Sequence, residues 1–221
     1  QTNPLDRVYN PNIPKYTFAP DKASGLLDSA GWKREGSRDI RRNADGSPLR
    51  FAFMTTAGNK TRELIQQVLQ SQWRKVGIDV RIRNEPPRVY FGETVTKRKF
   101  QGLAMYAWLS APRNVPRTSL HSESIPTDAN GWSGQNYPGY SNPELDKVLD
   151  DVEVVCEPKA NQALWNRLQT IYSNELPVLP LYFRATPFIL PKWLKGIRPT
   201  GHQYSTTLWV EDWFAAGRPG S

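Results

Sequence analysis

An aromatic run that stops at a basic loop is the part of this sequence whose residue types best suit ligand chemistry. Residues 105–114 read MYAWLSAPRN. In an extended strand alternate side chains share a face, so Tyr106 and Trp108 would form one apolar wall. The loop beyond them carries Arg113, whose planar guanidinium can pair with a carboxylate or a phosphate. The pattern predicts a site for a ligand with an anionic group.

Hydrogen-bonding groups on both sides of Arg113 would complete this site. We expect Ser110, the backbone near Ala111 and the amide of Asn114 to contact the ligand. A later loop, which we expect to fold over the same edge, adds three weaker candidates: Gln135, Asn136 and Tyr137. A second interpretation stays open, in which the two aromatic residues belong to the core and the arginine points to solvent or to another part of the protein.

Catalytic signatures are incomplete wherever the sequence approaches one. AGNKT at 57–61 joins a predicted strand to a helix, but a phosphate-binding loop needs glycine directly before the lysine. GWSG at 131–134 lacks a spacer of the nucleophile elbow. Acidic residues at 150, 151 and 153 lie on the polar side of a predicted helix, and no pair of carboxylates converges as in a carbohydrate-active enzyme. The sequence therefore predicts a protein that is not an enzyme.

Cysteine and histidine are too scarce for a metal centre. The chain has one cysteine, Cys156, and two histidines, His121 and His202, without metal-ligand spacing. We expect no metal and no other cofactor. Cys156 follows an apolar helical pattern, which predicts a half-buried helix residue with no assigned role.

A formal charge of +8 over 221 residues admits a polyanionic partner. Residues 33–42, KREGSRDIRR, concentrate five basic side chains in one stretch. Two acidic residues interrupt the run and the turn-forming NADGSP follows at 43–48, so a solvated hairpin is favoured. Only Trp32 is an aromatic neighbour, and nucleic-acid surfaces interleave several. We expect no nucleic acid, and a basic polyanion-binding domain remains the alternative function.

The elements that must position these residues alternate between helix and strand, which predicts an α/β fold. Expected helices lie at 20–32, 60–76, 88–100, 143–155 and from 158 onward; expected strands lie at 49–55, 78–87 and 103–109. Apolar stripes are expected from Leu64, Ile65, Val68, Leu69, Trp73 and Val76, from Leu145, Val148, Leu149 and Val152, and from Leu164, Trp165, Leu168, Ile171 and Tyr172. No apolar run is long enough to cross a bilayer. The irregular segment 110–142 has the length of a functional loop.

Four ordered segments together resemble a known family. YTFAPDKASGLLDSAGW, LRFAFMTTAGNKTRELIQQVLQSQWRKVGIDVRI, YSNPELDKVLDDV and RLQTIYSNELPVLPLYF resemble the carboxyl-terminal half of the extracytoplasmic peptide/nickel-type solute-binding proteins of ABC importers. The resemblance covers roughly residues 9 to 213. It implies one lobe of a two-lobe, periplasmic-binding-protein type II-like fold, with a mixed sheet and flanking helices.

The resemblance also implies a place in a larger protein. Residues 1–198 would form the carboxyl-terminal lobe, and residues 199–221 would return toward the hinge and an absent amino-terminal lobe that carries the export signal. The protein would be periplasmic, or extracytoplasmic and membrane-associated. It would capture a peptide or similar polar solute, such as an anionic conjugate, between its lobes and deliver it to the permease subunits.

The sequence departs from the family at the predicted site. In the peptide binders, an acid that follows the strand-end tryptophan receives the amino terminus of the ligand. Trp108 matches that tryptophan, but Ala111 stands where the aspartate would fall, with Arg113 two positions further on. Since replacing an acid by a base reverses the charge that is attracted, we expect altered ligand selection.

Overall fold

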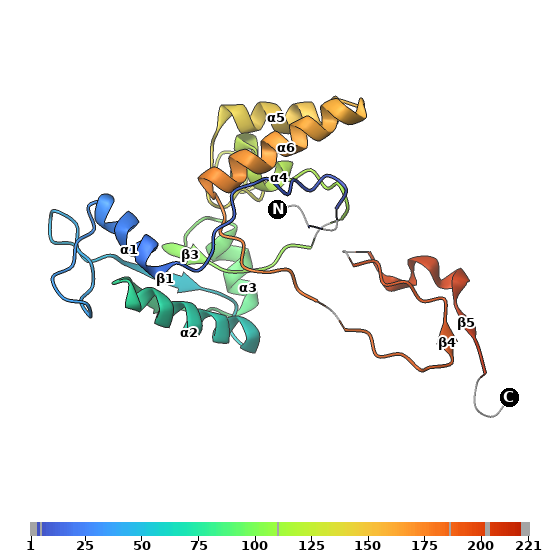
Figure 1. Ribbon diagram of the computed structural model, residues 1–221, viewed down its shortest axis with the longest axis horizontal. Helices are drawn as coiled ribbons and strands as arrows, with labels where there is room; N and C mark the ends of the chain where they lie inside the picture. The colour runs from blue at the N-terminus through green and yellow to red at the C-terminus, as the bar shows by residue number, and fades with distance from the viewer. Residues whose placement is uncertain (1–3, 5, 110, 186, 202–203, 218–221) are drawn as a thin grey trace. The chain divides into compact units, whose positions relative to one another are not determined.

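The computed structural model describes every residue except 1–3, 5, 110, 186, 202–203 and 218–221, and the chain divides into two compact units (Figure 1). The sheet unit comprises residues 14–107 and 117–146. The terminal unit comprises residues 1–13, 108–116 and 147–221.

A parallel sheet organises the sheet unit, which confirms the predicted α/β class. The strands are β1 (Arg50–Met54), β2 (Asp79–Ile82) and β3 (Gly102–Ala104), in the order β2-β1-β3 with both pairs parallel. The helices are α1 (Pro20–Ser29), α2 (Lys60–Lys75), α3 (Pro87–Val89), a π-helix (Tyr90–Val95), α4 (Arg117–Leu120) and a 3-10 turn (Ser122–Ser124). The sheet was expected to be mixed, but both of its strand pairs are parallel, and an antiparallel strand pair lies in a separate two-stranded sheet of the terminal unit.

Helix α2 covers one face of the sheet. Phe53 and Val80 are buried there, and the half-buried Ile65, Leu69 and Trp73 of the helix pack against them. The predicted stripe is too wide at its edge, because Leu64 and Val68 are 61% and 49% exposed. Three short strands offer a narrow apolar surface, so only the centre of the stripe finds a partner.

The opposite face carries a second apolar cluster. Met54, Tyr90, Val95 and Tyr137 are buried together. Phe53 and Met54 point to opposite faces because successive strand side chains alternate. The Tyr90 hydroxyl lies 3.1 Å from the carbonyl oxygen of Met105, to which it donates. Burial raises the pKa of this phenol well above its ordinary value.

The strand expected at 103–109 is shorter than predicted. The ladder ends where the Met105 amide donates to the Met54 carbonyl at 2.8 Å, because Met54 is the last residue of β1. The Met105 carbonyl accepts instead from the Thr55 hydroxyl at 2.8 Å. The chain from Met105 to Leu109 therefore continues beyond the end of β3 in irregular structure.

The basic hairpin at 33–48 forms as predicted, with antiparallel bridges between Lys33 and Arg42 and between Arg42 and Pro48. One of its basic side chains is not solvated, however. Arg41 is 1% exposed, and its guanidinium binds Asp28 at 2.7 Å. It also donates to the carbonyl oxygens of Ser24, Trp32 and Val76. This arginine therefore ties the hairpin to α1 and to the end of α2.

Gly77 follows α2 and makes this contact possible. Its φ of 87° lies in the left-handed region, which is common for the residue that follows a helix. A Cβ at this position would meet the Arg41 side chain at 2.8 Å. Only glycine therefore ends the helix here without displacing the buried arginine.

Two helices account for most of the burial in the terminal unit. Helix α5 (Pro143–Val154) begins in the sheet unit, and the Asn142 carboxamide caps it by accepting from the amides of Glu144 and Leu145. Helix α6 (Pro158–Glu175) is capped by the Glu157 carboxylate. These cap hydrogen bonds lower the pKa of Glu157. The predicted stripes are buried except at half-buried Leu164: Leu145, Val148, Leu149, Val152, Trp165, Leu168, Ile171 and Tyr172.

Cys156 is exposed and lies between the two helices, so its prediction as a half-buried helix residue was wrong. Helix α5 ends at Val154, and the following loop turns the thiol to solvent. The remaining elements are β4 (Leu194–Lys195), a 3-10 helix (Thr206–Asp212) and β5 (Phe214–Ala215), with β4 and β5 antiparallel.

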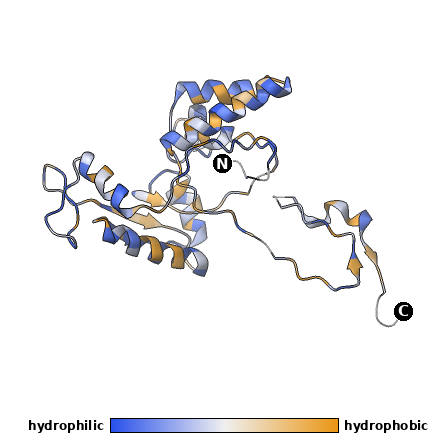
Figure 2. Ribbon diagram, viewed as in Figure 1, coloured by the Kyte–Doolittle hydropathy of each residue, from blue (hydrophilic) through white to orange (hydrophobic). Residues whose placement is uncertain are grey.

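The segment after α6 is extended and rich in apolar residues (Figure 2). Many of its large side chains are exposed, among them Leu179, Leu181, Tyr182, Phe183, Phe188 and Ile189. Apolar surface of this kind marks a place for a binding partner or another part of a protein. Within the described residues, no helix has the length and apolarity to span a membrane.

The Asp28–Arg41 pair generates a test of stability against pH. The Arg41 hydrogen bond holds the pKa of Asp28 below its ordinary value of 3.8. A lowered folded-state pKa contributes stability that is present above the unfolded value and is lost as the pH falls through the folded one. We expect Asp28→Asn to lower the thermal unfolding midpoint at neutral pH, and the deficit to shrink below pH 3.8.

Glu35→Gln is the matched control, because this exposed carboxylate of the same hairpin forms no ion pair with the described residues. Differential scanning calorimetry of both variants and the parent protein across acidic and neutral pH measures the effect. Equal deficits for Asp28→Asn at all pH values would contradict a contribution from the ionised carboxylate.

Candidate functional site

The carboxyl ends of the three parallel strands meet at one edge of the sheet and bring chemistry-bearing residues together. Thr55 and Thr56 follow β1, Asn84 and Glu85 follow β2, and Tyr106 follows β3. In open α/β sheets, ligands bind outside the carboxyl ends of the strands. This edge is therefore the candidate functional site of the sheet unit.

A buried hydrogen-bond network fixes the inner part of the edge. The Asn84 side-chain oxygen accepts from the Thr55 amide at 3.2 Å and from the Gln66 side chain at 3.0 Å. Gln66, from α2, also donates to the Phe53 carbonyl at 2.8 Å. Since Thr55 and Gln66 are both 0% exposed, these groups serve the fold and hold the strand ends in register.

Charged side chains lie nearer to solvent at the same edge. The Thr56 hydroxyl accepts from the half-buried Arg62 guanidinium at 3.1 Å. The Glu85 carboxylate accepts from the Thr94 hydroxyl at 2.6 Å. The edge thus offers one cation and one anion whose positions neighbouring hydroxyl groups hold.

Three aromatic rings pack edge to face beside these groups. Tyr106 meets Phe91 with 6.1 Å between ring centroids and Tyr137 with 6.0 Å. Tyr137 is buried, Tyr106 is half-buried and Phe91 is 40% exposed. Tyr106 was expected either to contact a ligand or to belong to the core. Its ring packs against the core cluster and is also partly accessible to solvent.

The AGNKT segment caps a helix. The Asn59 side chain accepts from the Arg62 amide at 3.1 Å, and the Glu63 carboxylate accepts from the Gly58 amide at 2.8 Å. The Gly58 amide lowers the pKa of Glu63. A carboxylate thus occupies the amino terminus of α2, where a phosphate-binding loop would hold its anion.

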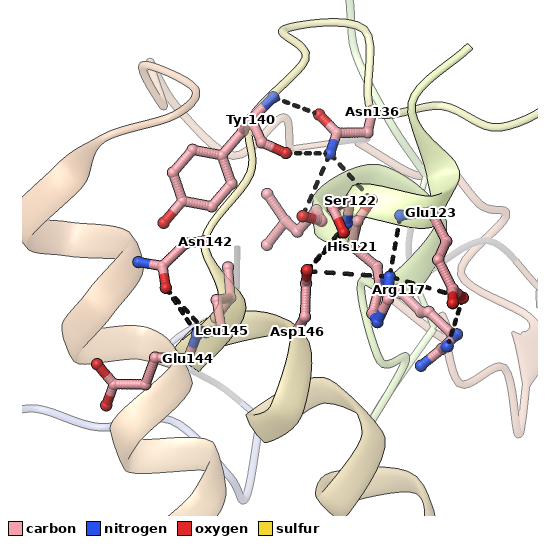
Figure 3. Close-up of polar contacts among 11 residues, drawn as sticks. Arg117, His121, Ser122, Glu123, Asn136, Tyr140, Asn142, Glu144, Leu145 and Asp146 are labelled. Atoms are coloured by element: carbon pink, nitrogen blue, oxygen red, sulfur yellow. Dashed lines mark hydrogen bonds and ion pairs between the residues drawn. The ribbon is translucent and has the colours of Figure 1, made fainter. Parts of the chain in front are cut away.

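Asn136 is the centre of a network that orders the loop 117–146 (Figure 3). Its side-chain nitrogen donates to the carbonyl oxygens of Leu120, His121 and Tyr140, at 3.3, 3.0 and 2.8 Å. Its side-chain oxygen accepts from the Tyr140 amide at 3.0 Å. The residue is 0% exposed, so its side chain stabilises the loop that carries the neighbouring Tyr137.

Asp146 joins this loop to the first turn of α5 (Figure 3). Its carboxylate accepts from the Ser122 amide at 2.9 Å and from the Ser122 hydroxyl at 2.5 Å. His121, which is 4% exposed, accepts through Nδ1 from the Glu123 amide at 3.1 Å. Arg117 pairs with the Glu123 carboxylate at 3.2 Å. The histidine and its neighbours thus support the loop, and the part of the chain that the structure describes holds no cluster of side chains suited to a metal ion.

The remaining predicted site residues lie in a turn of the terminal unit. The Asn114 amide donates to the Ala111 carbonyl at 3.1 Å, and Arg113 has a φ of 58°. The Arg113 amide donates to the Asp6 carboxylate at 3.0 Å. The side chains of Arg113, Asn114 and Trp108 are exposed, the last at 53%. Ser110 lies outside the described residues.

The predicted residues therefore form two groups. Tyr106 and Tyr137 contact each other at the sheet edge. Gln135 is close to Tyr137 in sequence, and its side-chain oxygen accepts from the Thr118 hydroxyl at 3.3 Å. Ala111, Arg113 and Asn114 share the turn in the terminal unit. Ligand binding by either group stays a prediction.

Sequence reasoning missed the polar residues at the sheet edge. Thr55 and Thr56, and then Asn84 and Glu85, directly follow the two strands that it predicted. Polar pairs after consecutive parallel strands are the signal that could have found them, because those strand ends share one edge.

Comparison with known proteins places the chain in a family. Residues 2–131 match the family described as "Bacterial extracellular solute-binding proteins, family 5 Middle". The chain belongs to this family. Its members are solute-binding proteins and not enzymes, as the sequence predicted.

Individual relatives agree with this assignment. The oligopeptide-binding protein AppA of Bacillus subtilis is 26% identical over 93% of this chain and 36% of its own length. The nickel-binding periplasmic protein of Escherichia coli is 24% identical over 80% of this chain and 34% of its own length. The chain thus spans about a third of the length of these relatives.

A solved structure has the same fold. The oligopeptide-binding protein from Thermus thermophilus, crystallised with a pentapeptide, matches with a TM-score of 0.78 and 32% sequence identity. The match covers 90% of this chain and 36% of that protein. The parallel sheet with flanking helices is therefore part of an oligopeptide-binding protein architecture.

The Asn136 network predicts that substitution of Asn136 lowers stability more than substitution of the adjacent Gln135. Asn136→Ala would leave the carbonyl groups of residues 120, 121 and 140 and the amide of residue 140 without this partner. We expect a loss of about 3 kcal/mol in the free energy of unfolding, measured by urea denaturation. Gln135→Ala, the adjacent control, removes a single longer hydrogen bond and should cost below about 1 kcal/mol. Similar losses for both variants would mean that the buried network does not order the loop.

Proposed function

We propose that this chain is the carboxyl-terminal lobe of the substrate-binding component of an ABC importer. In this proposal the protein captures a peptide or similar polar solute in a cleft between two lobes, outside the cytoplasmic membrane, and delivers it to the permease. The observation that carries the proposal is the family match over residues 2–131. Two of the similar proteins are named for oligopeptides and one for nickel, so the family supports a small polar cargo without selecting one.

Both groups of predicted residues are candidates for ligand contact in this proposal. Tyr106 supplies an aromatic surface with limited mobility because its ring packs against those of both Tyr137 and Phe91. Trp108, Arg113 and Asn114 add exposed side chains, and Ser110 and Ala111 add backbone contacts. Gln135 lies at the margin, and Asn136 acts by holding the loop in place.

The charge of the proposed site differs from that implied by the resemblance to peptide binders. Ala111 replaces the expected aspartate, and the nearest carboxylate with a described contact to this turn is Asp6. It accepts from the Arg113 amide and from the Val8 amide, which leaves the Arg113 guanidinium outside that contact. We therefore propose that the guanidinium attracts an anionic group of the solute.

Capture follows from lobe closure. A ligand shifts an equilibrium between open and closed states only by its difference in affinity for the two, so the closed state must add contacts. In this proposal the second lobe supplies them, and residues 199–221 return toward the hinge. Exposed apolar side chains in the segment after α6 support a further covering part of the protein.

Identification of the bound solute tests the proposed function. The full-length protein, purified from its own source, is weighed by native and then denaturing mass spectrometry. We expect a small polar solute that leaves on denaturation, and a mixture of short peptides would identify a peptide importer. A single anionic sugar or amino-acid conjugate would support Arg113 as the selecting residue. Enzymatic turnover of the released solute by the protein would contradict the proposal.

Substitution of Arg113 tests the selecting charge. Arg113→Ala keeps the backbone N–H that donates to Asp6 and removes the side chain beyond Cβ, including the guanidinium. A hydrogen bond to a charged group contributes about 1.5–3 kcal/mol, so affinity for an anionic solute should fall about ten- to a hundredfold in isothermal titration calorimetry. Arg88→Ala, at an exposed arginine of α3, is the control and should bind as the parent does. Unchanged affinity in Arg113→Ala would remove this residue from the site.

A further inference from the structure

A pocket lined by basic residues lies on the sheet unit between the hairpin and the end of α2. Ser37 and Arg38 of the hairpin and Arg74 and Lys75 of the last turn of α2 line a cavity of about 420 Å³. We call these four residues the basic pocket. Arg74 also lines an adjoining cavity of about 350 Å³, and the other residues that line it are Gln70, Ser71, Ile78, Asp79 and Val80. The proposed solute site does not use any of these residues.

Internal hydrogen bonds hold the two walls of the basic pocket together. The Arg34 guanidinium donates to the Ser37 carbonyl and to the Lys75 carbonyl, both at 3.0 Å. The Arg41 amide donates to the Gly77 carbonyl at 2.8 Å, and its buried guanidinium donates to the Val76 carbonyl at 2.7 Å. The hairpin is thus fixed against the end of α2, and the pocket exists before any ligand arrives.

Within the part of the chain that the structure describes, no carboxylate forms an ion pair with the basic residues of the pocket, Arg38, Arg74 and Lys75. Other basic residues of the sheet unit do form ion pairs, for example Arg50 with Asp79 at 2.5 Å and Lys97 with Glu93 at 2.9 Å. Of the two acidic residues of the hairpin, Asp39 accepts from the Gly36 amide and Glu35 is exposed.

The end of a helix explains only part of this arrangement. Arg74 and Lys75 complement the negative end of the α2 dipole, as basic residues commonly do in a last turn. That role does not account for Arg38, which lies on the hairpin. Arg34 also contributes to neutralising this helix end, because its guanidinium already donates to the Lys75 carbonyl. Three cations and a serine therefore face one open cavity.

We propose that the basic pocket binds a phosphate group. Two guanidinium groups offer paired donors that fit phosphate oxygens, the ammonium group adds a third charge, and the Ser37 hydroxyl can donate to a remaining oxygen. The phosphate belongs either to the headgroup of an anionic phospholipid or to free phosphate. Nucleic acid is a poorer fit, since no aromatic side chain lines either cavity for bases to stack on.

The test compares two variants of equal charge in the full-length protein. The pocket variant carries Arg38→Gln, Arg74→Gln and Lys75→Gln, and the control carries Lys15→Gln, Arg83→Gln and Arg88→Gln, three exposed residues elsewhere in the sheet unit. Binding is measured to radiolabelled inorganic phosphate by equilibrium dialysis. Binding to lipid vesicles is measured by sedimentation, with vesicles of phosphatidylglycerol mixed into phosphatidylcholine and with vesicles of phosphatidylcholine alone.

We expect the pocket variant to bind about 100-fold more weakly than the parent, because each cation near an anionic surface contributes about a fivefold factor. The control should stay within a few-fold of the parent, and high salt should weaken binding by the parent. Binding to phosphatidylglycerol vesicles alone would identify the headgroup as the source, and binding to inorganic phosphate would identify the free anion.

Two outcomes would overturn the proposal. One is the absence of binding by the parent to either probe at low salt. The other is an equal loss in the pocket variant and the control, which would assign the effect to net charge. Because glutamine keeps much of the aliphatic stem, circular dichroism and the thermal midpoint should match the parent in both variants. A folding defect in the triple variant would be resolved by the single Arg38→Gln variant on the hairpin, whose loss should be about fivefold.

Discussion

Parallel pairing of β1 with both neighbouring strands is the constraint on which the sheet unit depends. It requires each of the three strands to run in the same direction, so their carboxyl ends share one edge. The residues that follow the strands are therefore neighbours although they lie far apart in sequence. The Thr55 and Gln66 network at this edge satisfies the polar groups exposed where the ladder ends. The strand ends beside the aromatic residues around Tyr106 are therefore held in place.

Loops that leave this edge are ordered by a few buried polar side chains. Asn136 and Asp146 each bind two or more groups of the segment 117–146, which has little regular structure. Buried amides and carboxylates can do this because an unpaired backbone group in the interior is costly. A long loop can thus present Tyr137 to Tyr106 with the precision that a binding surface requires.

The basic hairpin divides its charges between structure and surface. Arg41 is buried and directs its donors to Asp28 and three carbonyl groups, and Arg34 binds two further carbonyl groups. These contacts hold the hairpin against α2 and leave Arg38, Arg74 and Lys75 facing solvent. Part of the net positive charge of the chain is thus concentrated in the basic pocket, which is separate from the edge where we propose that solute binds.

The sequence by itself determined the α/β class, the starts of the helices near residues 20, 60, 143 and 158, and the family, because caps, turns and periodicity are local properties. It also predicted that Tyr106 and Tyr137 belong to one region. Only the tertiary structure decided that β3 ends at Ala104, where β1 offers no further partner. It likewise decided that Arg41 is buried while Leu64, Val68 and Cys156 are exposed. Those outcomes depend on which surfaces distant segments provide, and a local pattern does not contain that information.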